Sequence, residues 1–209
     1  MSRPAEDAAG PPETIYIIRH AEKPDDPSAK PHGVDFQGVH SKHCLLPRGW
    51  QRSGALTALF DPALGPPQAG LLTPATLLCP SYGGPDKTVE HRAYQTIQGL
   101  AERLGLPIAS PFIAGHEAQL AASLVTDYSG AVLICWEHDN IPALAGALPT
   151  APGTVIPSQW PDDRFDVIWA FTLAPGPAPV SYAFTQIPQQ LLSGDTGTVI
   201  GVANCCDVD

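Results

Sequence analysis

The segment Thr14-Ile-Tyr-Ile-Ile-Arg19 decides the fold, because it is short, almost wholly apolar and rich in β-branched residues. A run of this kind predicts a buried strand. The runs Ala75–Cys79 and Ala131–Trp136 have the same character. Polar residues follow each run, and in α/β sheets reacting groups gather where strands end. The ends of these strands are therefore the places to look for a site.

Helical periodicity alternates with these strands. It predicts helices over Pro47–Phe60, Val89–Leu104 and His116–Thr126, and a further helix with Pro142 in its first turn. Phe165–Leu173 and Val180–Phe184 predict two adjacent antiparallel strands. Strands that alternate with helices predict a three-layer α/β/α sandwich with a mostly parallel central sheet and an antiparallel edge.

The composition indicates a globular protein. The chain has 209 residues, of which 44% are hydrophobic, and a formal net charge of −10. We expect a flexible segment over 1–13 and a single domain over 14–209. No apolar run approaches the ~20 residues of a membrane span, and 1–13 lacks a signal-peptide core, so we expect a cytoplasmic protein without membrane contact. The negative charge disfavours nucleic-acid binding. The adjacent Cys205 and Cys206 have two interpretations, a redox-active pair or a C-terminal tail without a role, and we expect the second.

Two arginines and two histidines lie at the ends of these elements. Arg19 and His20 end the first strand, Arg92 lies in the first turn of a helix, and His138 follows the strand at 131–136. The planar fork of arginine donates two hydrogen bonds to phosphate oxygens. Nearby positive charge lowers the pKa of a histidine and keeps its imidazole neutral, which is the nucleophilic form. The set predicts a site for a tetrahedral dianion.

Four ordered motifs carry a resemblance to a known family. They are IRHAEKP at 18–24, LPRGWQRSG at 46–54, HRAYQT at 91–96 and WEHDNIP at 136–142. In order and spacing, over roughly residues 14–200, they resemble the histidine phosphatase superfamily, whose fold is phosphoglycerate-mutase-like. The run between Ser81 and Arg92 is longer than in the compact family motif. Ala21 replaces the glycine usual in the mutase branch, which disfavours a sugar-phosphate mutase.

The resemblance implies roles for particular residues. His20 would be the nucleophile that forms a phosphohistidine, and Arg19, Arg92 and His138 would bind the phosphoryl group. The proton donor would be Glu117, as in one branch of the family, or Asp139, as in another. The implied function is a metal-independent phosphomonoester hydrolase, without a cofactor, acting on a small phosphorylated metabolite or a phosphoprotein.

Other interpretations stay open. The same scaffold could carry an acid–base enzyme that uses Glu117, His138 and Asp139 on a substrate without phosphate. It could also bind a phosphorylated partner without turnover. A further cluster, His32, His40, His43 and Cys44, has zinc-ligand residue types, but its spacing matches no standard structural zinc site. We therefore expect a solvated or substrate-facing loop there.

Overall fold

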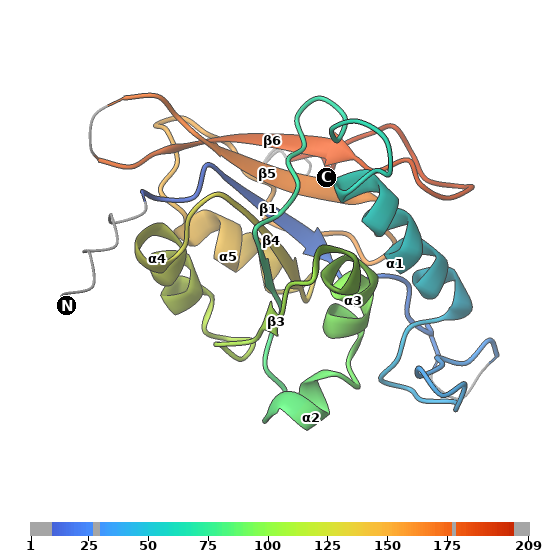
Figure 1. Cartoon of the computed structure of the whole chain (residues 1–209). Helices are drawn as coiled ribbons and strands as arrows, with labels where there is room; N and C mark the ends of the chain where they lie inside the picture. Colours follow the sequence, from blue (N-terminus) through green and yellow to red (C-terminus); the bar gives the residue numbers. More distant parts are fainter. Residues whose placement is uncertain (1–9, 27–29, 177–178, 203–209) are drawn as a thin grey trace, which may run out of the picture.

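The computed structural model describes residues 10–26, 30–176 and 179–202, so most of the predicted segment 1–13 and the pair Cys205–Cys206 lie outside the described residues. Within that part, six strands form one mixed sheet in the order β3-β2-β4-β1-β5-β6 (Figure 1). β1 (Thr14–Arg19) and β4 (Ala131–Trp136) have the predicted bounds. They pair in parallel, from Thr14 opposite Ala131 to Arg19 opposite Trp136. Their carboxyl ends therefore lie together.

The rest of the sheet confirms the mixture of parallel and antiparallel pairs. β2 (Thr76–Leu78) is parallel to β4, and β3 (Ile108–Ala109) is parallel to β2. On the other side, β5 (Val167–Leu173) is antiparallel to β1 and to β6 (Tyr182–Pro188). The sequence did not predict β3, because two residues are too few to show a periodicity.

The described residues contain five helices: α1 (Pro47–Phe60), α2 (Pro85–Thr88), α3 (Arg92–Leu104), α4 (Glu117–Asp127) and α5 (Ile141–Ala147). α1 has the predicted bounds. The predicted start of α3 at Val89 is wrong, because His91 has an extended backbone that separates α3 from the short helix α2. None of these helices is long and apolar enough to cross a membrane.

The side chains of β1 alternate between two apolar clusters. Ile15 and Ile17 pack in the cluster that contains buried residues of α4 and α5. Tyr16 and Ile18 pack in the cluster that contains buried residues of α1 and α3. Because successive strand residues point to opposite faces, helices cover both faces of the sheet. Figure 1 shows the same pairing of helices, with α1 beside α3 and α4 beside α5.

The loop that follows β1 is packed closely against α1. The backbone N–H of Leu46 donates a hydrogen bond to the carbonyl of Glu22, at 2.9 Å. A Cβ on Gly49 would lie 2.7 Å from the same carbonyl oxygen. The glycine is therefore required by this close approach, which fixes the chain just after His20.

Candidate active site

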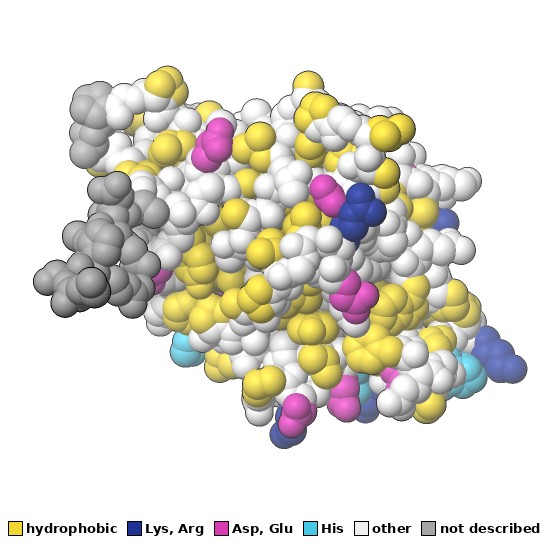
Figure 2. Space-filling model, in the orientation of Figure 1, with side chains coloured by type: hydrophobic (Ala, Val, Ile, Leu, Met, Phe, Trp, Pro, Cys, Tyr) yellow, Lys and Arg dark blue, Asp and Glu magenta, His cyan; other side chains and the backbone are white. Residues whose placement is uncertain are grey.

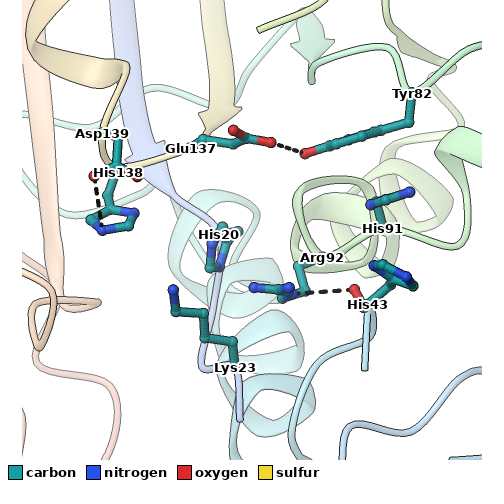
Figure 3. Close-up of a pocket in the computed structure, with 9 residues that line it drawn as sticks. All are labelled: His20, Lys23, His43, Tyr82, His91, Arg92, Glu137, His138 and Asp139. Carbon is teal, nitrogen blue, oxygen red and sulfur yellow. Dashed lines mark hydrogen bonds and ion pairs between the residues drawn. The ribbon is translucent and has the colours of Figure 1, made fainter. Parts of the chain in front are cut away.

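A cavity of about 290 Å³ opens at the carboxyl ends of β1 and β4. Its lining residues are His20, Lys23, His43, Tyr82, His91, Arg92, Glu137, His138 and Asp139 (Figure 3). Four of the six predicted site residues are among them, from three separate regions of the chain. The parallel pairing of β1 with β4 brings His20 near His138, with ring centroids 6.4 Å apart.

His20 is held in one tautomer. Its side chain is buried, and its Nδ1 lies 2.8 Å from the carbonyl oxygen of Ala21. A carbonyl only accepts hydrogen bonds, so Nδ1 carries the proton and Nε2 keeps its lone pair. Burial, followed by the charges of Arg92, Arg19 and Lys23, holds the pKa of His20 well below its usual value of 6.5. The imidazole is therefore neutral and nucleophilic at neutral pH.

Arg92 is the first residue of α3 and is fixed to the loop before α1. Its Nε donates to the carbonyl of His43 at 3.2 Å, and its Nη2 donates to that of Lys42 at 3.4 Å. The hydroxyl of Thr96 donates to the Arg92 carbonyl and accepts the backbone N–H of Ala21. These bonds tie the start of α3 to the residue after His20.

Arg19 lies next to the cavity but is not among its lining residues. Its side chain is 1% exposed, and its Nη1 donates to the carbonyls of Pro161, Asp162 and Arg164. The guanidinium carbon lies 3.9 Å from the ring centroid of Phe165. Its Nε and Nη2 are buried and have no hydrogen-bond partner among the described residues. Burial lowers the pKa of Arg19 to about 10. An unpaired buried donor is unfavourable, so the burial of these two groups is a cost to the fold.

The ring of His138 is bound by carboxylates. Its Nε2 lies 2.5 Å from Oδ1 of Asp162 and 3.4 Å from Oδ1 of Asp139. The hydrogen bond to His138 lowers the pKa of the Asp162 carboxyl. This is the one group of three or more His, Cys, Asp or Glu side chains, in the described part of the chain, with ligand atoms within 4.8 Å of one another. Both carboxylates are exposed.

The hydrogen bond with Asp162 occupies Nε2 of His138, which would otherwise be available to an anion in the cavity. We expect Asp162→Asn to tighten the binding of inorganic phosphate or vanadate by roughly two- to tenfold, because one negative charge leaves the neighbourhood of His138. Isothermal titration calorimetry measures the change. The matched control is Asp163→Asn, an exposed carboxylate on the same segment that does not contact His138. Equal or weaker anion binding by the Asp162 variant would show that the carboxylate does not compete.

Glu117 does not line the cavity. Its Oε1 accepts hydrogen bonds from the Gly115 backbone N–H and from the Trp136 indole N–H, each at 2.9 Å. The carboxylate is thus used to fix the start of α4 to the end of β4. Of the two predicted proton donors, only Asp139 lies at the cavity.

Five lining residues were not predicted as site residues: Lys23, His43, Tyr82, His91 and Glu137. The carboxylate of Glu137 accepts a hydrogen bond from the Tyr82 hydroxyl at 2.7 Å, and the Tyr82 ring stacks on His91 with centroids 3.7 Å apart. The position of Glu137, directly after a strand, could have identified it. Tyr82 and His91 gave no comparable signal, because their places depend on the turn around α2.

The four residues considered as zinc ligands do not converge. The rings of His32 and His40 are 4.8 Å apart, whereas His43 faces His91 at 5.3 Å. The Cys44 thiol is buried and donates to the carbonyl of Glu90. Of these four residues, His43 is the one that lines the cavity; that the loop faces a substrate stays a prediction.

Comparison of the sequence with models of known protein families, and with curated proteins, finds no match. The functional argument therefore depends on the motifs and on the geometry of the cavity.

Proposed function

We propose that the chain is a phosphomonoester hydrolase of the histidine phosphatase type, with the three-layer, phosphoglycerate-mutase-like fold of that family. The observation that carries the proposal is His20, a buried neutral imidazole with a free Nε2, on the wall of a cavity that also contains Lys23 and Arg92. The proposal is supported by the helices on both faces of the sheet and by the four motifs, three of which contribute residues to the cavity.

The reaction follows from this arrangement. Nε2 of His20 attacks phosphorus in line, and the bond from phosphorus to the ester oxygen breaks. The departing oxygen takes a proton from a carboxylic acid, and the same group then acts as base for the water that hydrolyses the phosphohistidine. Inorganic phosphate leaves and neutral His20 is restored. Arg92, Lys23 and His138 stabilise the charge on the transferring group.

Asp139 is the proton donor in this proposal. We expect Asp139→Asn to lower kcat by about 10²-fold with substrates whose leaving groups need protonation, because general acid catalysis contributes at least that much. Glu117→Gln keeps an oxygen that can accept the Trp136 indole N–H, so its kcat should stay within about threefold of the wild type. Steady-state kinetics with an alkyl phosphate compares the two variants. The reverse pattern would assign the donor to Glu117.

The proposal is tested with an aryl phosphate and a chelator. We expect para-nitrophenyl phosphate to be hydrolysed at an unchanged rate after dialysis against EDTA, because every group in the reaction is a side chain. Loss of turnover that added metal restores would instead make His138, Asp139 and Asp162 a metal site. Absence of turnover before and after dialysis, with folded protein, would contradict the proposed function.

A cavity of about 290 Å³ also limits the substrate. It lies at the lower end of the ~300–1,000 Å³ that is usual for small-molecule sites. This volume favours a small phosphorylated compound, or a single phosphorylated side chain of a protein.

A further inference from the structure

The cavity contains basic groups that the proposed reaction does not use. His43 and His91 lie beyond Arg92 as seen from His20 (Figure 3), and their ring centroids are 5.3 Å apart. Both line the same cavity as His20. The phosphoryl group needs His20, Arg92 and His138, so these two imidazoles are left for another part of the substrate.

The ring of His91 and the backbone of His43 are held in place before any substrate binds. The His91 ring stacks on Tyr82 with an interplanar angle of 1°, and the Tyr82 hydroxyl is bound by Glu137. The carbonyl of His43 accepts a hydrogen bond from Nε of Arg92. Fixed donors reduce the entropy that is lost when a ligand binds. The ring of His91 and the backbone that carries His43 are therefore already ordered when a ligand arrives.

Arg92 is the cation beside this pair and favours an anion, against the carboxylates of Glu137 and Glu90, which also act on His91. The nearest carboxylate of the cavity, Glu137, already accepts the Tyr82 hydroxyl hydrogen bond. An imidazole donates an N–H hydrogen bond when neutral and adds a positive charge when protonated. Basic side chains are uncommon elsewhere on the molecule. The chain has a net charge of −10, and the Lys and Arg side chains are few and scattered on the face shown in Figure 2.

We propose that His43 and His91, with Arg92 between them and His20, bind a second oxyanionic group of the substrate. This inference rests on the proposed function, and it narrows the substrate to a small phosphate ester that carries a further carboxylate or phosphoryl group. The second group would accept hydrogen bonds from the imidazoles while the ester phosphorus lies at Nε2 of His20.

Matched substrates test the inference. Phosphoglycolate is compared with ethyl phosphate, and a propanediol bisphosphate with propyl phosphate, so that a carboxylate and a phosphoryl group are tested separately. In at least one pair, we expect the ester with the second acidic group to exceed the ester without it in kcat/KM by about tenfold or more. This factor corresponds to one charge-assisted hydrogen bond. The pair that shows the preference identifies the second group. No preference in either pair would overturn the inference.

Variants assign the preference to the two histidines. In the double variant His43→Gln, His91→Gln we expect the ratio of the two kcat/KM values to fall to about a tenth of its wild-type value. His116→Gln is the matched control, because His116 is exposed and does not line the cavity, and it should keep the wild-type ratio. A preference that survives in the double variant would overturn the assignment. Circular dichroism shows that each variant is folded.

Calorimetry separates this inference from the proposed function. If no ester is hydrolysed, the phosphatase reaction is contradicted, but the second subsite is still measured by the binding of pyrophosphate and of inorganic phosphate. We expect pyrophosphate to bind about tenfold more tightly to the wild type, and this advantage to disappear in the double variant. Equal affinities in the wild type would overturn the inference whatever the kinetics show.

Discussion

His20→Ala is expected to abolish turnover of para-nitrophenyl phosphate, with kcat lower by roughly 10⁴-fold or more, because removal of a covalent nucleophile leaves only the stabilisation supplied by the other groups. The variant should also form no phosphoenzyme. In the wild type, rapid quenching with a radiolabelled phosphate ester should trap an acid-labile, base-stable phosphohistidine. His116→Ala serves as the control for loss of a histidine elsewhere. Equal turnover by His20→Ala and wild type would contradict the proposed mechanism.

The pH dependence of the same reaction is a further result expected from His20. Protonation of Nε2 removes the lone pair, so the rate falls as the pH drops through the pKa of His20. Burial and the charges of Arg92, Arg19 and Lys23 lower that pKa. The acid limb attributable to the nucleophile should therefore lie well below pH 6.5, the usual value for histidine. Single-turnover formation of the phosphoenzyme measures it, and a limb above that value would assign the limiting group elsewhere.

Local patterns in the sequence were enough to predict the bounds of the two central strands and of the first helix. β1, β4 and α1 have the predicted bounds because each has an unbroken pattern, and in α1 proline also marks the first turn. The parallel pairing of β1 and β4 then makes it necessary that His20 and His138 come close. This part of the site depends on strand ends, which a sequence can locate.

The direction of each side chain was harder to predict. Arg19 and His20 are adjacent, and neighbouring residues of an extended chain point to opposite sides. His20 lies on the side of α3 and Arg92, whereas Arg19 contacts the segment at 161–164. The same alternation at the end of β4 sends Trp136 toward Glu117 and Glu137 toward Tyr82. The motif at 136–142 contains Glu137, but a string of letters does not show this alternation, so no role was predicted for Glu137. Glu117 was suggested by the family resemblance, which does not show that its carboxylate binds Trp136 instead of facing the cavity.

A buried ion network behind the cavity supports the loop that carries Lys23. Arg52 of α1 donates to the carboxylate of Glu22 at 2.8 Å and forms two hydrogen bonds, at 2.7 and 2.9 Å, with that of Asp195. Its Nη1 also donates to Gln189. The side chains of Arg52 and Asp195 are only 2% and 3% exposed. Arg52 thus joins the loop after His20 to the C-terminal part of the described chain.

Arg52→Ala should therefore lower the free energy of unfolding by about 3 kcal/mol, because it removes the buried cation that two buried carboxylates share. Glu22 then keeps only the more exposed Arg48 as an ion-pair partner, and Asp195 keeps the backbone N–H groups of Leu191 and Leu192. Urea unfolding followed by tryptophan fluorescence measures the loss. Arg103→Ala is the matched control, since Arg103 forms a 2.8 Å pair with Asp61 but is 47% exposed, and its removal should cost less than about 1 kcal/mol. Similar losses in the two variants would show that burial of the network is unimportant.

The pH dependence of the difference in unfolding free energy between wild type and Arg52→Ala tests whether the charge of Arg52 stabilises the fold. Burial by itself raises the pKa of Asp195, but the hydrogen bonds and charge of Arg52, together with the backbone N–H groups of Leu192 and Leu191, lower it to about 2, against 3.8 for a free carboxyl. Asp195 therefore stabilises the wild type above pH 3.8, by about 2 kcal/mol, and loses this contribution as the pH falls toward 2. In Arg52→Ala the backbone N–H groups of Leu191 and Leu192 still bind the carboxylate, but the charge of Arg52 is gone, so the pKa of Asp195 rises relative to the wild type. The gap in stability between wild type and variant should consequently narrow by about 1 kcal/mol between neutral pH and pH 3. A gap that stays constant would mean that Arg52 stabilises the fold by packing and not by its charge.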